Sequence, residues 1–69
     1  MPYAERTPAN VGLGQLWRAP DGQHYEVAAI SKEMVALNRA TAAGRVLDIG
    51  YALYQPVERV RGEWVFVKA

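Results

Sequence analysis

The stretch of sequence that decides the fold is SKEMVALNRATAAG, residues 31–44, because it can be interpreted in two ways. As β structure, the three polar residues before Met34 form a hairpin connection, and the apolar Val35 and Leu37 alternate with their neighbours along one strand. In that strand both apolar side chains would face the core, beside those of the preceding strand. The alternation therefore predicts a strand over residues 34–39.

The same stretch also has features that are typical of a helix. Four alanines between residues 36 and 43 have high helix propensity, Ser31 is a suitable N-cap, and Gly44 is a suitable C′ residue. A helix here would have to pack on a sheet of three or four strands, which its narrow apolar face would cover poorly. We therefore predict the strand, with an α+β fold and a helix over residues 32–43 as the alternative.

Upstream of this stretch the sequence predicts a tight hairpin. Residues 16–18 form a short strand, and Ala-Pro-Asp-Gly follows at residues 19–22. Proline suits the first corner of a type I turn, aspartate the second, and Gly22 the left-handed position that closes a three-residue hairpin. The next strand is expected over residues 24–30. Its alternation puts three side chains on one face: Tyr25, Val27 and Ala29.

Downstream, two further strands and a turn are expected. Residues 45–51, RVLDIGY, have an apolar residue at every second position from Leu47 and predict a strand. Residues 52–61 contain Pro56, which lacks the N–H group that a central strand needs, so a turn with a short helical piece is expected. Residues 63–68, EWVFVK, have high β propensity and predict the last strand.

Five short strands, a tight first hairpin and a turn of helix before the last strand are typical of a small barrel. Closure of a barrel removes the exposed edges that a flat sheet of this size would leave. The predicted fold class is therefore all-β, a five-stranded SH3-like barrel. Residues 11–69 are expected to form this single domain, and residues 1–10, which have two prolines and no periodicity, a flexible N-terminal arm.

The composition of the 69 residues argues against several classes of function. Eight Lys and Arg against seven Asp and Glu leave a net charge of +1, too little for a tail that binds nucleic acid by charge alone. The chain has no cysteine for a disulfide or thiolate metal site, and its single histidine, His24, cannot form a two-histidine site. No apolar run approaches the ~20 residues of a membrane span, and the first residues do not resemble a signal peptide. We expect a cytoplasmic protein without membrane, metal or cofactor.

Catalytic residues are not expected either. His24 and Glu26 would share the solvent face of a strand, whereas a catalytic base needs a cleft and an organised partner. No serine, cysteine or lysine stands in a nucleophile motif. The carboxylates of Asp21, Glu26 and Asp48 do not follow the spacing of a cation-binding loop. The chain is therefore predicted not to be an enzyme.

Two families of small barrels resemble parts of the chain. The opening GLGQLWR at residues 12–18, followed by Gly22 and by Tyr-Glu-Val at residues 25–27, resembles the first hairpin of the KOW and Tudor-like group. That resemblance implies an SH3-like barrel that binds RNA, ribosomes, polymerase or peptides. The run Val-Glu-Arg-Val at residues 57–60 resembles the late segment of the plasmid-encoded, trimethoprim-insensitive dihydrofolate reductase. This second resemblance implies an oligomeric barrel with a shared pore.

The candidate binding residues are arginines and aromatic residues near the end of the chain. Arg59 and Arg61 lie close in sequence to Tyr54 and Trp64. Aromatic and arginine side chains together stack on bases and pair with phosphates in single-stranded nucleic acid. The same residue types are enriched at protein interfaces. The sequence leaves open whether these residues contact a protein, contact a nucleic acid, or have no binding role.

The terminal run Trp-Val-Phe-Val at residues 64–67 is apolar on both faces of a strand. Either Trp64 and Phe66 or the two valines must therefore lie outside the core, and exposed apolar rows mark interfaces. A domain this small also has a marginal core, which favours self-association. The leading hypothesis is a non-enzymatic module that binds a protein partner, including a second copy of itself. A nucleic-acid-binding barrel is the alternative, and an oligomeric reductase is the second alternative.

Overall fold

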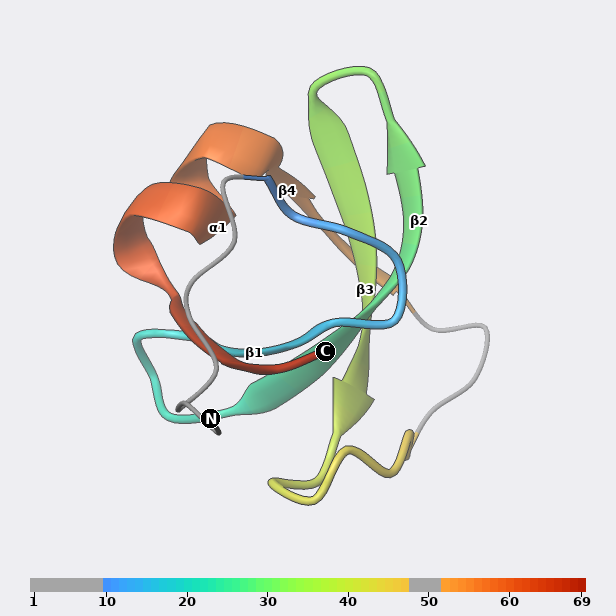
Figure 1. The fold of residues 1–69 in the computed structure, drawn as a ribbon, viewed down its shortest axis with the longest axis vertical. Coiled ribbons are helices and arrows are strands. Elements are labelled where there is room, and N and C mark those ends of the chain that lie inside the picture. The colour runs from blue at the N-terminus through green and yellow to red at the C-terminus, as the bar shows by residue number, and fades with distance from the viewer. Residues whose placement is uncertain (1–9, 48–51) are drawn as a thin grey trace, which may run out of the picture.

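The computed structural model describes residues 10–47 and 52–69, which contain five strands and one helix (Figure 1). In chain order these are β1 (Leu16–Arg18), β2 (His24–Ser31), β3 (Met34–Ala40), β4 (Ala52–Pro56), α1 (Val57–Glu63) and β5 (Val65–Lys68). The strands form one antiparallel sheet with the order β4-β3-β2-β1-β5. The predicted all-β class, with five strands and a short helix before the last one, is confirmed.

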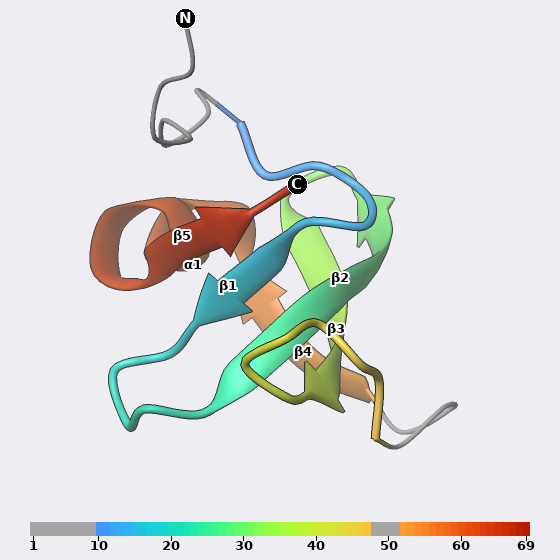
Figure 2. The same ribbon diagram turned by 60° about the horizontal axis from the view of Figure 1, so that its bottom comes forward.

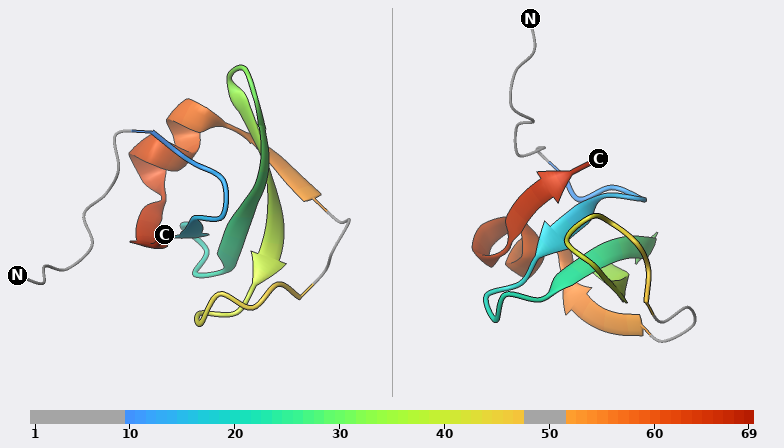
Figure 3. Two further views of the ribbon diagram at one scale, coloured as in Figure 1. Left: turned by 45° about the vertical axis from the view of Figure 1, so that its right-hand side comes forward. Right: turned by 90° about the horizontal axis from the view of Figure 1, so that it is seen from below.

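The sheet is strongly curved. Strands β4 and β5 are its two edges, yet the seven residues of α1 are enough to join them. Figures 1 and 3 show β2, β3 and β4 on one side, α1 facing them, and β1 and β5 between the two. This arrangement is compatible with a small barrel-like fold. The described residues contain no helix that is long and apolar enough to cross a membrane.

The stretch that decides the fold is a strand, as its alternation predicts, and no helix covers residues 32–43. Val27 of β2 pairs with Leu37 of β3, and both side chains are buried. The register then shifts between Val27 and Ala29, where β2 has one residue more than β3. Because of this β-bulge, Ala29 is exposed instead of joining Val27 on the inner face, which corrects the expectation for that side chain.

The first hairpin is confirmed in detail. The amide of Gly22 donates a 2.9 Å hydrogen bond to the carbonyl of Ala19, and Gly22 has φ = 90°. The carboxylate of Asp21 accepts a 2.9 Å hydrogen bond from the amide of Gln23, which fixes the second corner of the turn. The sequence predicted each of these roles, because proline, aspartate and glycine have distinct preferences at the corners of a turn.

The segment between β3 and α1 differs from the expectation. Of the predicted strand at residues 45–51, the described part, residues 45–47, forms only an isolated bridge between Val46 and Ala40, and residues 48–51 lie outside the described part. The fourth strand is Ala52–Pro56, where a turn was expected. Pro56 is compatible with it because it is the last residue of a strand at the sheet edge. The expected arm over residues 1–10 also lies outside the described residues, except for Asn10.

The core lies between the concave side of the sheet and α1. Its most deeply buried large side chains are Trp17, Leu37, Val35 and Val60. Phe66 meets Trp17 edge to face, with 5.4 Å between ring centroids. Trp64 is 8% exposed, whereas Val65 is 48% exposed. Trp64 and Phe66 therefore face the core, and this resolves the two orientations that the sequence left open for β5.

Candidate functional site

A groove with a volume of about 270 Å³ lies between α1, β4 and the turn of the first hairpin. We call it the α1 groove. Its larger and charged lining side chains are two aromatic, one aliphatic and three charged: Tyr25, Trp64, Leu53, Asp21, Arg59 and Glu63. They come from four separate parts of the chain, which the curvature of the sheet brings together.

An aromatic pair forms part of the wall of the α1 groove. The rings of Tyr25 and Trp64 are 5.3 Å apart between centroids, with their planes tilted by 48°. Tyr25 is half-buried and packs on the core cluster to which Trp64 belongs. Packing against the core holds both rings in place. Because Trp64 is 8% exposed and Tyr25 is half-buried, a ligand in the groove would meet mainly the ring of Tyr25, which Trp64 supports from behind.

Leu53 brings an aliphatic side chain to the same groove. It pairs with the fully buried Leu37 of β3 but is itself 36% exposed, because it lies on the edge strand β4. Gln55, two residues further on, also lines the groove, as the alternation of a strand requires. The groove thus has an apolar part that a ligand side chain can cover.

Charged groups surround this apolar part. Arg59 and Glu63 are four residues apart on α1, so they lie on the same side of the helix. Asp21, in the hairpin turn, contributes a second carboxylate. Two carboxylates and one guanidinium give the groove a formal charge of −1, which is opposite in sign to the +1 of the whole chain.

A second, smaller concavity lies on the other face of the sheet. It has a volume of about 110 Å³ and is lined by residues of β2, β3 and β4 that include Ala29, Met34, Ala36 and Tyr54. Met34 is 40% exposed and Tyr54 67% exposed. We call this concavity the outer hollow. It is largely apolar and lies beside the edge of the sheet.

The structure separates the five residues that the sequence singled out. Arg59 and Trp64 lie together in the α1 groove, whereas Tyr54 lies at the outer hollow. Arg61 donates a 3.2 Å hydrogen bond to the side chain of Asn10, and Phe66 packs on Trp17 in the core. These residues are neighbours in sequence, but a strand and a helix turn their side chains in different directions.

Sequence reasoning did not assign Tyr25, Leu53, Asp21 and Glu63 to a binding site. The alternation of β2 indicated that Tyr25 faces inward, but not that it meets Trp64, which is 39 residues away (64 − 25). The sequence did not indicate a binding role for Leu53, because its segment was expected to be a turn. A groove built from four segments becomes visible only when the fold is known.

The described residues hold no group of three or more His, Cys, Asp or Glu side chains that could bind a metal ion. His24 pairs across the sheet with Arg18 and Ala40, and Glu26 pairs with Leu16 and Asn38. No protein-family model, curated protein or solved structure matches this chain. The fold and the two concavities are therefore the basis for a functional proposal.

Proposed function

We propose that this chain is a non-enzymatic binding module that holds a segment of a protein partner in the α1 groove. The observation that carries the proposal is the contact between Tyr25 and Trp64 in the groove wall, with Leu53, which is 36% exposed, lining the same groove. Small binding sites typically combine such an apolar surface with a few polar groups that orient the ligand. The strand order and the helix between β4 and β5 also support an SH3-like barrel as the scaffold.

The charges around the groove favour one kind of partner segment. Asp21 and Glu63 outnumber Arg59, so a basic side chain in the ligand would gain more than an acidic one. Leu53 and the aromatic pair would be covered by an apolar side chain of the same segment. The partner of this module is therefore expected to present an apolar residue next to a lysine or an arginine.

Selection from a displayed peptide library tests this proposal. Peptides that bind the wild-type chain should be enriched in apolar residues adjacent to basic ones. Leu53→Ser should weaken the selected peptides at least about tenfold, or about 1.4 kcal/mol, because it removes apolar surface from the groove. Leu13→Ser is the matched control, since Leu13 is 69% exposed and does not line the groove. If both variants bind equally well, the groove is not the binding site.

Charge reversal provides a second arm of the same experiment. Glu63→Lys should select peptides with fewer basic residues, because it changes the formal charge of the groove from −1 to +1. Unchanged selection by this variant would mean that the charges of the groove do not choose the partner.

A second candidate function is self-association through the outer hollow. Tyr54 is the large apolar side chain with high exposure on the edge strand β4, and Met34 lies across the same hollow. Sedimentation velocity over a range of concentrations tests this candidate. A dimer that Tyr54→Asp converts to monomer would support it, whereas a wild-type monomer at every concentration would exclude it.

A further inference from the structure

Three cationic side chains gather around the loop of residues 41–47. We call this region the basic end; its members are Arg18, Arg45 and Lys68. Arg39 of β3 lies at the same end of the sheet, but it pairs with Tyr25, so its side chain leaves the opposite face. Arg45 belongs to the loop itself, and the carbonyl of Arg39 accepts a 2.8 Å hydrogen bond from the amide of Leu47. The ammonium group of Lys68 donates a 2.7 Å hydrogen bond to the carbonyl of Ala43. All three side chains of the basic end are exposed.

The pairing of the strands brings Arg18 to the same region. Arg18 of β1 pairs with His24 of β2, His24 pairs with Ala40 of β3, and Ala40 forms the bridge to Val46 in the loop. These four residues therefore form a row across the sheet that ends at the loop. Figures 2 and 3 show the loop, drawn in yellow, lying close to β1 and β2.

The loop is held in one conformation by hydrogen bonds. The amide of Thr41 donates to the carbonyl of Arg45 at 2.8 Å, and the amide of Gly44 donates to the carbonyl of Thr41 at 2.9 Å. The hydroxyl oxygen of Thr41 also accepts a 3.1 Å hydrogen bond from the amide of Arg45. The backbone that carries Arg45 is therefore fixed relative to the sheet, which reduces the entropy lost when its side chain binds an anion.

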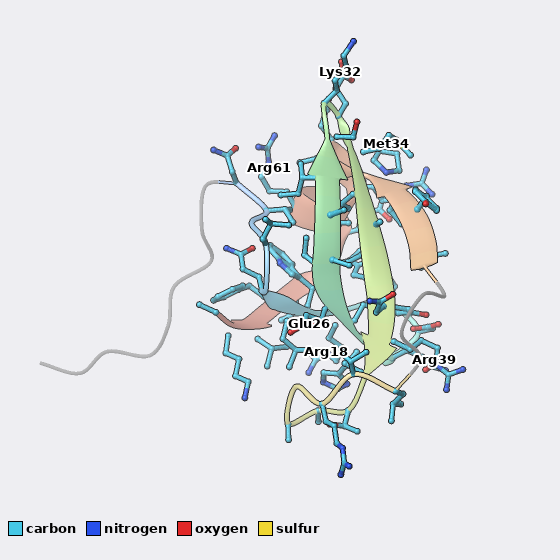
Figure 4. The ribbon with its side chains drawn as sticks, turned by 90° about the vertical axis from the view of Figure 1, so that its right-hand side faces the viewer. Arg18, Glu26, Lys32, Met34, Arg39 and Arg61 are labelled. Atoms are coloured by element: carbon cyan, nitrogen blue, oxygen red, sulfur yellow. The ribbon has the colours of Figure 1, made fainter. Side chains whose placement is uncertain are left out.

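Few carboxylates of the described residues oppose this positive charge. Glu26, on the same outer face, is half-buried between Leu16 and Asn38. Asp21 lines the α1 groove, and Asp48 lies outside the described residues. In Figure 4, Arg18 and Arg39 lie at the end of the sheet near the loop, and Lys32 and Arg61 lie toward the opposite end. The charge is thus unevenly distributed, although the net charge is only +1.

We propose that the basic end binds the phosphate backbone of a nucleic acid. From Arg18 on β1 to Val46, the neighbour of Arg45 in the loop, there are three inter-strand spacings, or about 14 Å. Several phosphates occupy that length, since each strand of a duplex carries one about every 3.4 Å along the axis. Cations spread over this distance match a chain of phosphates better than a single phosphoryl group.

An anionic lipid surface fits these observations less well. Membrane binding by a surface of this kind needs a continuous apolar patch that enters the lipid together with the cations. The large exposed apolar side chains of the region are Val65, which pairs with Arg18, and Leu47, which follows Val46 at the other end of the cross-strand row. The row separates them, so they form no continuous patch. The basic end is also distinct from the α1 groove, and its ligand does not depend on the proposed protein partner.

Fluorescence anisotropy of labelled oligonucleotides tests the proposal, with single-stranded RNA, single-stranded DNA and duplex DNA as separate probes. The wild-type chain should bind at least one probe, with a log–log slope of affinity against salt of about −2 to −3, as expected for three phosphate contacts. The variant Arg18→Gln, Arg45→Gln should bind at least about tenfold more weakly at low salt. Its slope should be shallower by about 1.4 on a single strand or about 1.8 on the duplex, because two contacts are lost.

The matched control is Lys32→Gln, Arg61→Gln, which removes the same formal charge at the opposite end of the molecule. It should leave the affinity within about twofold and the slope unchanged, if position and not net charge determines binding. Equal weakening by both double variants would overturn the proposal. So would the absence of binding to every oligonucleotide at low salt, or binding to phosphatidylserine vesicles alone. Thermal melts of both variants check that each is folded. If the first is not, Arg45→Gln alone replaces it, with a slope shallower by about 0.7 on a single strand.

Discussion

The side-chain oxygen of Gln15 accepts a 3.0 Å hydrogen bond from the indole nitrogen of Trp17. The same oxygen accepts a 2.7 Å hydrogen bond from the backbone amide of Gly12. Trp17 is fully buried in the centre of the core, so its N–H group depends on this partner. Gln15 therefore joins the segment that precedes β1 to the largest buried side chain of the domain.

Replacing Gln15 with leucine should destabilise the domain by about 1–3 kcal/mol, because two N–H donors would lose their acceptor. Urea unfolding, followed by tryptophan fluorescence, measures this loss. Gln15→Glu is the control, since glutamate keeps an acceptor oxygen at the same position, and it should retain most of the stability. Equal stability of Gln15→Leu and the wild type would mean that water replaces the lost acceptor.

Neighbouring residues near the start of β5 should differ sharply in their contribution to stability. Trp64→Ala should cost about 3–5 kcal/mol, since Trp64 is 8% exposed and packs on Tyr25. A loss of that size is enough to unfold a domain this small. Val65→Thr should change stability by less than about 0.5 kcal/mol, because Val65 is 48% exposed. Thermal melts of both variants test the orientation of β5, and the reverse order of stability would contradict it.

Local chemistry made some of the elements predictable from the sequence. The turn at residues 19–22 has a separate residue preference at each corner, and β3 has a clean alternation at Val35 and Leu37. The orientation of residues beyond Val27 in β2 could not be predicted. Two consecutive alanines follow Val27, and neither has a side chain large enough to show which of them is the extra residue of the bulge.

The position of the fourth strand and the groove depended on tertiary structure. Leu53 and Gln55 alternate with exposed neighbours, but Pro56 suggested a turn because its place at a sheet edge was not known. The basic end is a similar case, since Arg18 and Arg45 are 27 residues apart (45 − 18) and come to the same end of the sheet only through the pairing of three strands. Sites that combine distant segments leave no local pattern in a sequence.

Alanine at two glycines should have opposite effects on stability. Gly44 has φ = 97°, and an added Cβ atom would lie 3.1 Å from Cε of Lys68. Gly44→Ala should therefore cost about 1–2 kcal/mol. Gly62 lies in α1 with nothing within 4 Å of an added Cβ atom, so Gly62→Ala should stabilise by about 0.5–1 kcal/mol. Chemical denaturation measures both variants, and a change of the same sign in both would contradict either the left-handed conformation of Gly44 or the helical conformation of Gly62.

The hydrogen bond between Lys68 and Ala43 should control the local opening of the loop at residues 41–47. Lys68→Met removes the ammonium donor but keeps an unbranched apolar side chain beside Gly44 and Leu16. The backbone hydrogen bonds within the loop remain, so global stability should fall by no more than about 1 kcal/mol.

Amide hydrogen exchange should nevertheless speed up about fivefold at Gly44 in this variant, which corresponds to about 1 kcal/mol of local opening. Lys32→Met is the control, because Lys32 is an equally exposed lysine at the tip of the β2–β3 hairpin. It should leave exchange at Gly44 unchanged. Equal exchange rates in the two variants would mean that the loop is held by its own hydrogen bonds, and that Lys68 is free to contact a ligand without opening it.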